Sequence, residues 1–442
     1  MYSSAIYKKS PVIIQSAMVS LRGLIRGAIR SERRIATLKN RLKENERSEE
    51  MLAAFREERL DFALSNAKGT EAFKQNTEFA EFGFVDKDEV KASPDDFTNK
   101  HVKPFITVKG STSGTTGAPL SIPQNLDSVL REQAFVSRYL EWAGFKQGDH
   151  RAWLRGDLVV PMEQKSGPFW RYSYFENMIV MSSFHLSSEA IPSYLKAMKD
   201  YGVDIIQAYP SSIATLAKYL ESVDQYYQGR LKSIMTSSEA LSQEDRQIIE
   251  KRFKCKVFDW YGLFERVAAI GSCEHGNYHL ISDYSHVEFV ESGDGKHEIV
   301  GTSYNNALYP LIRYRTGDHV VLATNQTCPC GRVFPVIKSI EGRTVSHVYN
   351  EDHEKVYALD QCVKGVAGVI GSQYHQDQFG SITVSVLVND DYDREQEEKL
   401  VSNVKARLGS SMQVNIDIVE TLVRSKNGKV IQAICTIEDD EK

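Results

Sequence analysis

The sequence has few cysteines, no strong excess of either charge and no long apolar run. Six cysteines in 442 residues are too few for a disulfide framework, which predicts a reducing, cytoplasmic environment. The net charge of -5 excludes the basic composition typical of nucleic-acid-binding proteins. We find no apolar run near the roughly 20 residues that span a bilayer, and no signal-peptide core at the N-terminus. These absences predict a cytoplasmic protein that does not bind nucleic acid.

The composition that remains is that of an ordinary globular protein. Hydrophobic residues make up 41% of the chain and charged residues 26%. A chain of this length can bury a large core and is expected to form two or more domains.

Residues 1–48 differ from the rest in charge. They hold eleven Lys or Arg against three Glu, a local net charge of +8. Apolar residues recur at helical spacing between Met18 and Ile29, with Arg22, Arg26 and Arg30 beside them. Such a basic amphipathic helix can lie on an anionic membrane surface as a peripheral contact. A helical arm that packs on its own domain is the alternative.

The middle of the chain alternates short apolar runs with helical patterns. We predict a strand over 203–210, a helix over 211–222, a strand over 231–241, a helix over 242–253 and a strand over 255–262. This order favours a parallel, helix-covered sheet, in which ligands sit at the carboxyl ends of the strands. After residue 343 the pattern changes to a small α+β unit: helices over 353–363 and 393–408, and strands over 368–376, 381–389 and 413–420.

The stretch STSGTTGAPL, residues 111–120, combines hydroxyl side chains with glycines. Glycine lets several backbone amides point at one anion, so the loop can hold a phosphate. A surface linker is the other interpretation of this loop taken alone.

Five stretches in order resemble the adenylate-forming ligases. They are the loop at 111–120, SSEAL at 237–241, DWYGLFE at 259–265, YRTGD at 314–318 and RSKNGK at 424–429. YPSSIATLAKYL, LYPLIRYRTGD and CPCGR resemble the branch that includes phenylacetate-CoA ligase and the CapK capsule-biosynthesis proteins. The resemblance covers residues 50 to 442 and is strongest between 105 and 343.

The resemblance implies an α/β fold with three parts. The basic N-terminal arm, 1–48, precedes a large adenylation domain with helix-covered sheets, 49–341. A small, mobile α+β lid domain, 342–442, follows a hinge at Gly342 and Arg343. Lid rotation between half-reactions would bring a lysine near the chain end into the active site. The oligomeric state, monomer or dimer, stays open.

The resemblance also implies ATP-dependent activation of a carboxylic acid, followed by acyl transfer to a thiol or an amine. Positioning and charge neutralisation carry most of such chemistry. The residues that the family would use for ATP and phosphate are Ser113, Gly114, Thr115, Thr116, Gly117, Ser238, Glu239, Tyr261, Gly262, Asp318 and Arg343. Glu265 would help hold Mg²⁺, a cation that prefers carboxylate oxygens. Lys429 would contact the α-phosphate and the carboxylate as a point charge.

Three departures from the family pattern bear on activity. Ala118, Pro119 and Leu120 stand where a lysine commonly follows the phosphate loop. Phe264 precedes Glu265 where a small hydroxyl residue is usual. The hinge lacks the paired aspartates and the glycine-rich stretch of the phenylacetate ligases, which puts coenzyme A as the acceptor in doubt and favours an amine as an alternative.

The acyl pocket of this branch would be lined by Ala208, Tyr209, Pro210 and Ser211, with Trp260 and Gly262. Aromatic walls suit an aryl or modest apolar acid, although they are equally normal core residues. A hydrophobic pocket separates homologous acids by only a few kcal/mol, so the residues do not name the acid.

Four residues outside these motifs suit a metal. Cys273, His279, Cys328 and Cys330 offer three thiolates and one imidazole, a set that suits structural zinc. His275 is a competing ligand, and buried thiols without a metal are the alternative. We expect Cys255, Cys362 and Cys435 to pack in the core.

Two functions other than a ligase remain open. The altered hinge is compatible with a degenerate nucleotide-binding regulatory protein. The basic arm is compatible with a scaffold of a membrane-associated glycan assembly complex.

Overall fold

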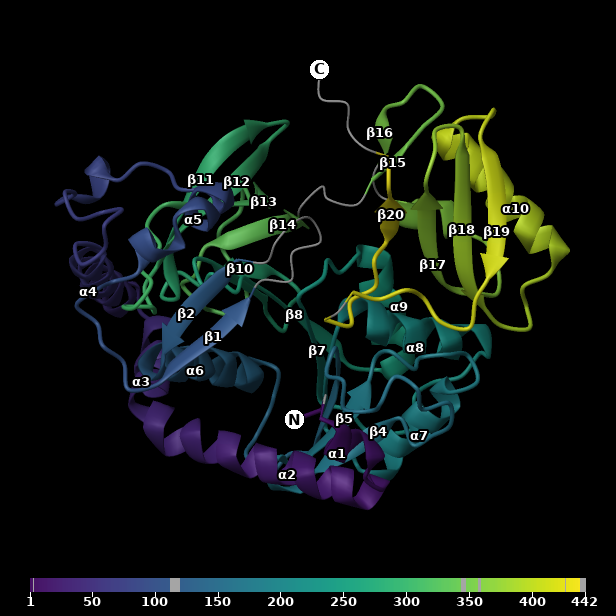
Figure 1. The fold of residues 1–442 in the computed structure, drawn as a ribbon, viewed down its shortest axis with the longest axis horizontal. Helices are drawn as coiled ribbons and strands as arrows, with labels where there is room; N and C mark the ends of the chain where they lie inside the picture. The colour runs from purple at the N-terminus through teal and green to yellow at the C-terminus, as the bar shows by residue number, and fades with distance from the viewer. Residues whose placement is uncertain (3, 112–119, 343–346, 357–358, 426, 438–442) are drawn as a thin grey trace.

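The computed structural model describes residues 1–442 except 3, 112–119, 343–346, 357, 358, 426 and 438–442. It has the predicted mixed α/β fold, with one large sheet, helices on both of its faces, and a smaller unit at the C-terminal end (Figure 1).

The large sheet has 12 strands among the described residues, in the order β11-β12-β13-β14-β10-β9-β8-β7-β6-β3-β5-β4. Its strands are β3 (Arg151–Arg155), β4 (Trp170–Ser173), β5 (Met178–Ser182), β6 (Ile205–Ala208), β7 (Ser233–Ser237), β8 (Lys256–Gly262), β9 (Ala269–Ser272), β10 (Tyr278–Leu280), β11 (Ser285–Gly293), β12 (Lys296–Ser303), β13 (Tyr314–Leu322) and β14 (Val336–Gly342). From β5 through β3, β6 and β7 to β8 neighbouring strands are parallel, and the strands beyond them pair antiparallel. The predicted parallel sheet is therefore one part of a larger mixed sheet.

Helices cover both faces of the parallel strands. On one face lie α7 (Ile191–Asp200), α8 (Pro210–Ser222) and α9 (Gln243–Phe253), and on the other lie α3 (Glu32–Asn45) and α6 (Leu126–Trp142). Helix α4 (Glu49–Ala67) packs beside α3 and contacts the antiparallel strands β11 and β12. Short elements precede α6: η1 (Phe79–Glu81), α5 (Lys87–Ala92), η2 (Pro94–Phe97) and the hairpin β1 (Thr107–Ser111) and β2 (Ser121–Asn125). Both helical layers pack buried aliphatic and aromatic side chains onto the sheet.

The C-terminal unit is built on a four-stranded sheet of order β19-β18-β17-β20. Its elements are β15 (Val348–Tyr349), β16 (Lys355–Val356), η4 (Leu359–Val363), β17 (Val369–Gln376), β18 (Ser381–Val388), α10 (Arg394–Leu408), β19 (Gln413–Ile418) and β20 (Ala433–Cys435). It has a core of its own in which α10 packs on the sheet. The helix predicted over 353–363 is wrong, because 355–356 pair with β15 and only a 3₁₀ turn follows.

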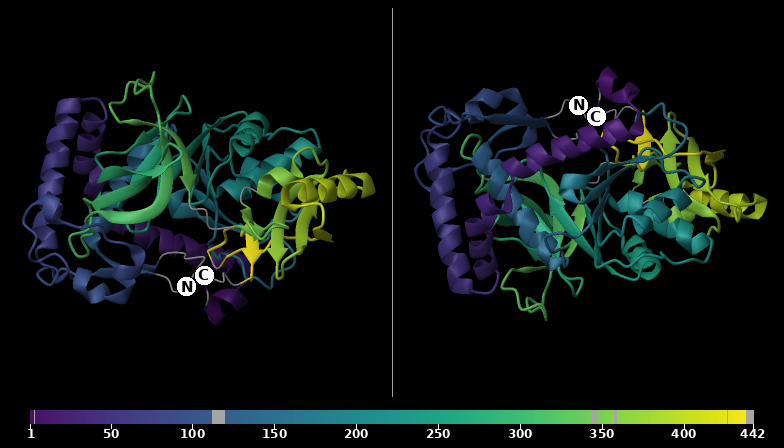
Figure 2. Two further views of the ribbon diagram at one scale, coloured as in Figure 1. Left: turned by 90° about the horizontal axis from the view of Figure 1, so that it is seen from above. Right: turned by 90° about the horizontal axis from the view of Figure 1, so that it is seen from below.

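The N-terminal arm runs along the outside of the large sheet at its β4 edge. It comprises α1 (Ala5–Lys9), α2 (Val12–Ile29) and α3, the last of which turns onto the sheet. Seen from below, α2 crosses the near surface of the molecule (Figure 2). Ser20 donates its hydroxyl to the Tyr172 carbonyl at 3.2 Å and accepts the Tyr174 amide at 3.0 Å. The helix thus satisfies backbone groups of a strand at the sheet edge, which would otherwise be open to pairing.

Candidate active site

The predicted adenine-stacking and ribose-binding residues are in direct contact. Tyr261, at the end of β8, donates its hydroxyl to Asp318 Oδ2 at 2.8 Å. Asp318 is buried on β13, and the Thr316 hydroxyl accepts its backbone amide at 3.0 Å. A carboxylate fixed in this way can accept hydrogen bonds from two neighbouring hydroxyls of a ligand, because each of its oxygens has more than one lone pair.

Glu265, the predicted Mg²⁺ ligand, is also buried near this face. The Tyr314 hydroxyl donates to its Oε1 at 3.4 Å. Phe264, beside it, occupies the space where a Cβ on Gly110 would lie, with the ring 2.2 Å from that position. The aromatic residue that replaces the usual hydroxyl therefore packs on β1, the strand that leads into the predicted phosphate loop.

The segment predicted to border the adenine lies at the carboxyl end of β7. Ser238 has a positive φ of 74° and accepts a hydrogen bond from the Arg155 guanidinium at 2.6 Å. Glu239 accepts the Ser211 amide at 2.9 Å and so caps the first turn of α8. This turn brings the ends of β3, β6 and β7 together, as expected for a ligand site in a parallel sheet.

The loop that carries Lys429 is docked against these strand ends. The Tyr209 hydroxyl donates to the Asn427 carbonyl at 2.8 Å. Arg424 donates to the Gly428 carbonyl at 2.9 Å and to the Ser212 hydroxyl at 3.3 Å. A Cβ on Gly156 would lie 1.6 Å from the Asn427 carbonyl oxygen, so only glycine permits this approach.

Lys429 follows a tight turn in this loop. The Ser425 amide donates to the Lys429 carbonyl at 2.8 Å, and Arg424 and Val430 form an isolated bridge. The turn presents a half-buried lysine directly beyond Gly428, which is itself buried against Gly156. The structure therefore brings the predicted catalytic lysine to the carboxyl ends of the parallel strands.

Burial changes the acidity of the side chains around the docked loop. It lowers the pKa of Arg155 and of Arg424, against the opposing effect of Glu239 on both guanidinium groups. It also raises the pKa of the Tyr209 phenol, although Arg155 lies over the ring at 5.0 Å from its centroid. Tyr209 therefore stays a neutral hydrogen-bond donor at neutral pH.

A chamber of about 1230 Å³ opens beside this site. That exceeds the usual 300–1,000 Å³ of small-molecule pockets. Of the predicted residues, Ser238, Trp260 and Gly262 line it, whereas Tyr209 and Ser211 instead bond the docked loop and Glu239. Its far wall comes from the arm and α6.

Basic side chains outnumber acidic ones in the lining of the chamber. The basic residues are Arg26, Arg30, Lys39, Lys43, Lys146, Arg151, Arg155 and Arg266, and the acidic ones are Glu32, Glu132, Glu141, Asp149 and Glu176. Arg26 is paired with Glu176 at 2.9 Å and Arg266 with Glu132 at 3.6 Å. Arg151 instead donates to neutral oxygens, those of the Gln207 side chain and the Glu176 carbonyl, both at 3.3 Å. Burial lowers its pKa, and its buried Nε has no partner among the described residues.

Six predicted site residues cannot be placed. Ser113, Gly114, Thr115, Thr116, Gly117 and Arg343 lie outside the described residues. Their roles stay predictions. Two arginines near the site, Arg151 and Arg155 on β3, were not predicted from the sequence motifs. The sequence signal for Arg155 is its place at the end of a strand, directly before Gly156.

The predicted metal-binding residues form one group. The ligand atoms of Cys273, His279, Cys328 and Cys330 lie within 4.8 Å of one another. Cys273 Sγ is 3.7 Å from Cys328 Sγ, and Cys330 Sγ is 3.4 Å from His279 Nε2. Ligands on a tetrahedral zinc would be about 3.5–3.8 Å apart, given Zn–S near 2.3 Å and Zn–N near 2.0–2.1 Å.

Neighbouring groups orient this cluster. The Phe334 carbonyl lies 3.1 Å from His279 Nδ1 and directs Nε2 toward the thiols, as backbone carbonyls do for zinc-bound histidines. Asn277 donates to Cys328 Sγ at 3.2 Å. His275 is exposed and is not part of the group, so His279 is the histidine that the structure selects.

The sequence is similar to two known proteins and to one family model. It is 25% identical to protein CapK of Staphylococcus aureus, in an alignment that covers 98% of this chain and 99% of that protein. It is 22% identical to phenylacetate-coenzyme A ligase of Pseudomonas putida over 72% of this chain and 75% of the ligase. The family model described as the CapK C-terminal domain matches residues 348–435.

The fold also matches a solved ligase structure. A 2-hydroxyisobutyryl-CoA ligase in the postadenylation state, in complex with 2-HIB-AMP, aligns with a TM-score of 0.63 and 14% identity, over 87% of this chain and 89% of that one. At this identity the match establishes the shared fold.

Proposed function

The chain belongs to the adenylate-forming superfamily, in the branch of CapK and phenylacetate-CoA ligase, and we propose that it is an AMP-forming ligase that activates a carboxylic acid with ATP. The carboxylate oxygen attacks the α-phosphorus, the bond to pyrophosphate breaks, and an acyl-adenylate forms. A thiol or amine then attacks the acyl carbon, loses its proton, and AMP leaves.

One observation supports this proposal above the others. Motif residues from far-separated parts of the chain converge on the carboxyl ends of the parallel strands. Tyr261 and Asp318 are bonded to each other, and the Lys429 loop is docked on Tyr209 and Gly156. This convergence is the arrangement that an adenylation site requires, with the lysine loop at the strand ends that bind the nucleotide.

The described residues have distinct roles in the proposed reaction. Asp318 binds the ribose hydroxyls, and Tyr261 lies against the base while holding the Asp318 carboxylate in place. Lys429 neutralises charge on the α-phosphate and the attacking carboxylate, which is where negative charge is concentrated in the transition state. Docking of its loop also excludes water from the adenylate, which would otherwise be hydrolysed.

Mg²⁺ fits the carboxylate of Glu265. The side chain is buried, and carboxylate oxygens are the ligands that this cation prefers. When bound, Mg²⁺ neutralises phosphate charge. Tyr314 orients the Glu265 carboxylate through its hydroxyl.

The chamber bears on the choice of acid. The aromatic residues predict an aryl or apolar acid, yet the described lining adds Arg151 and Arg155, whose hydrogen bonds in the structure go to neutral oxygens. A half-buried guanidinium without a carboxylate partner is stabilised by an anion from the ligand. We therefore propose an acid or acceptor that carries a second anionic group.

Zinc in the cluster of Cys273, His279, Cys328 and Cys330 would be structural. Four protein ligands fill a tetrahedral site and leave no position for a substrate. The cluster joins the β9–β10 turn to the segment before β14. Metal binding would therefore stabilise the end of the large sheet that leads to the hinge.

The proposed acceptor is coenzyme A or an amine. Coenzyme A is supported by the phenylacetate-coenzyme A ligase relative, and an amine is supported by the altered hinge sequence. We propose a role in cell-surface polysaccharide biosynthesis, from the resemblance of the sequence motifs to the CapK capsule-biosynthesis proteins, with the reaction in the cytoplasm.

The test is ATP-dependent pyrophosphate release across a panel of acids, with hydroxylamine to trap acyl-adenylate. Each acid is run without acceptor, with coenzyme A and with an amine. Turnover that yields a hydroxamate supports the ligase. ATP binding without pyrophosphate release from any acid would contradict it and support a nucleotide-binding regulatory protein.

A further inference from the structure

Helix α2 packs on the protein with its polar side inward. Its buried residues are Gln15, Ser16, Val19, Ser20 and Gly23, of which only Val19 is a large apolar residue. Gln15 donates to the Tyr7 carbonyl at 2.8 Å and accepts from Arg171 at 2.5 Å. Soluble amphipathic helices normally bury their apolar stripe instead.

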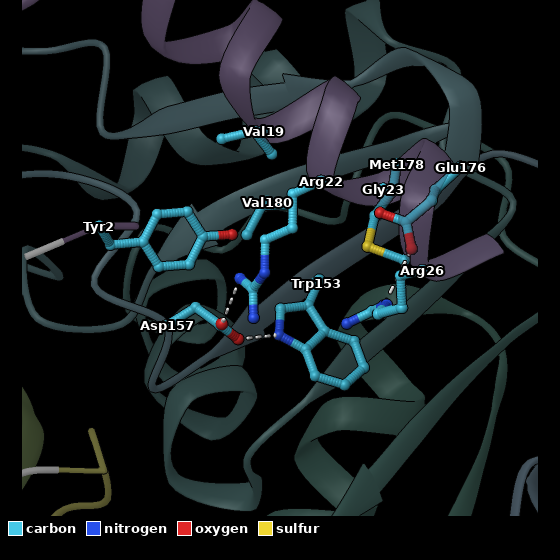
Figure 3. Close-up of a pocket in the computed structure, with 10 residues that line it drawn as sticks. All are labelled: Tyr2, Val19, Arg22, Gly23, Arg26, Trp153, Asp157, Glu176, Met178 and Val180. Carbon is cyan, nitrogen blue, oxygen red and sulfur yellow. Dashed lines mark hydrogen bonds and ion pairs between the residues drawn. The ribbon is translucent and has the colours of Figure 1, made fainter. Parts of the chain in front are cut away.

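Ion pairs hold the same side of the helix. Arg26 contacts Glu176 at 2.9 Å, and Arg22 contacts Asp157 at 4.0 Å, next to the bond from Trp153 to Asp157 (Figure 3). These charged contacts and the serine bonds to β4 fix the rotation of α2 about its axis. The opposite face therefore cannot turn inward.

That opposite face is apolar and exposed. Its large side chains are 39% to 83% exposed: Ile13, Ile14, Leu21, Leu24, Ile25 and Ile29. At 100° per residue these positions fall on one side of the helix. Tyr174 and Phe175 of η3 (Tyr174–Glu176), a turn that packs beside α2, are exposed as well. An exposed apolar helix face with exposed aromatic residues near it marks an interaction site.

Cations lie at both ends of the apolar face. Lys8 and Lys9 precede it and Arg33 and Arg34 follow it, all four exposed. The arm as a whole carries eleven basic residues against three acidic ones. An apolar face between basic clusters matches an anionic lipid surface, where the headgroups pair with the cations and the aliphatic side chains enter the acyl boundary. Exposed aromatic residues beside it suit the same interface.

The packing distinguishes a helix that lies on a membrane from one that spans it. Val12–Ile29 is long and apolar enough by length and composition to cross a bilayer, with a hydropathy of 1.4, contrary to the expectation from sequence. To span, however, it would have to give up the bond of Gln15 with Arg171 on β4 and the contacts of Ser20 and Arg26 with η3. These contacts favour a helix that stays in the plane of the surface.

We propose that the exposed face of α2, with Tyr174 and Phe175, docks the protein on an anionic lipid surface. The cytoplasmic leaflet presents such a surface. Because Arg26 and Gly27 of the same helix and Arg30 directly after it line the chamber, docking sets one wall of the chamber at the lipid boundary.

The experiment is vesicle flotation of the full chain with phosphatidylcholine alone and with phosphatidylcholine plus phosphatidylglycerol. The wild type is expected to float with the anionic vesicles and less so at high salt. Leu21→Glu with Ile25→Glu should lower the binding constant by about tenfold or more, because two aliphatic side chains no longer enter the lipid. Ile418→Glu, at an exposed position on β19, is the matched control and should bind like the wild type.

A second variant tests the proposal even if Leu21→Glu with Ile25→Glu misfolds. Lys9→Glu with Arg33→Glu alters exposed side chains for which the structure shows no hydrogen bond or ion pair among the described residues, and it should reduce binding to anionic vesicles while leaving the thermal unfolding transition in place. Wild-type protein that floats with neither vesicle overturns the proposal. So does concentration-dependent dimerisation that Leu21→Glu abolishes without any vesicle binding, since a second copy of the chain would then cover the face.

Discussion

Tyr209 and Asn427, 218 residues apart in the chain, are joined by a hydrogen bond of 2.8 Å from the tyrosine hydroxyl to the asparagine carbonyl. Tyr209 is the single residue between β6 and α8, and Asn427 lies two residues before Lys429. The bond therefore ties the lysine loop to the large sheet and fixes the position from which the lysine can act.

Gly156→Ala should prevent this docking. A Cβ would overlap the Asn427 carbonyl oxygen at 1.6 Å, so the loop must move. We expect pyrophosphate release to fall about tenfold or more, as misplacement by an ångström costs in other enzymes. Acyl transfer from a preformed adenylate should change far less, since it does not need the lysine at the phosphate.

Gly83→Ala is the control for that variant, because a Cβ there meets no atom within 4 Å. Equal rates of pyrophosphate release for Gly156→Ala and Gly83→Ala would show that the docked loop is not the arrangement that performs adenylation.

Asp318→Asn should weaken ATP binding. The change removes the charge from an acceptor that we assign to the ribose hydroxyls, and hydrogen bonds to charged groups contribute about 1.5–3 kcal/mol. We expect the KM for ATP to rise by about 10- to 100-fold, measured by pyrophosphate release. Asp417→Asn, exposed on β19, should leave the KM unchanged. An unaltered KM in Asp318→Asn would place the ribose elsewhere.

Cys328→Ser should remove a metal from the protein. We expect one zinc per chain in the wild type by plasma mass spectrometry, and loss of zinc together with a lower Tm in the variant, because a structural metal stabilises the folded state. Cys255→Ser, outside the cluster, should keep its zinc. Purified wild type without stoichiometric metal after zinc supplementation would refute the site.

Arg151→Met should change acid selectivity. If the chamber binds a second anionic group, the wild type favours a dicarboxylic acid over the monocarboxylic acid of equal length. The variant should lose about 10- to 100-fold in kcat/KM for the diacid, the cost of one charged hydrogen bond, and little for the monoacid. Arg230→Met, on an exposed loop, is the control. A wild type that prefers the monoacid would contradict the proposed substrate class while leaving the ligase proposal in place.

The elements around the site follow closely from local sequence patterns. The runs at 203–210, 211–222, 242–253 and 255–262 form β6, α8, α9 and β8 as predicted. These segments have clear apolar periodicity and strong end signals, such as Ser242 accepting the Asp245 amide at the start of α9. In these segments the local sequence is sufficient to predict the helix or strand.

The remaining features depend on contacts between distant segments. The antiparallel half of the large sheet requires pairings such as that of β10 with β14, which no local pattern specifies. The apolar stripe of α2 identified a helix, but not that its polar side faces inward, because that choice depends on β4 and Arg171. The roles of Arg151 and Gly156 likewise emerge only when strand ends and the lysine loop meet.

The most direct test of the account is the formation of acyl-adenylate by Lys429→Ala. The wild type should release pyrophosphate and yield a hydroxamate with at least one acid. The variant should lose on the order of 10²- to 10³-fold in that rate, as loss of one transition-state charge contact does, while Arg394→Ala on the exposed face of α10 keeps full activity. Wild-type activity in a folded Lys429→Ala protein would contradict the assignment of this lysine to adenylation. It would also contradict the claim that docking of the loop positions a residue for that step.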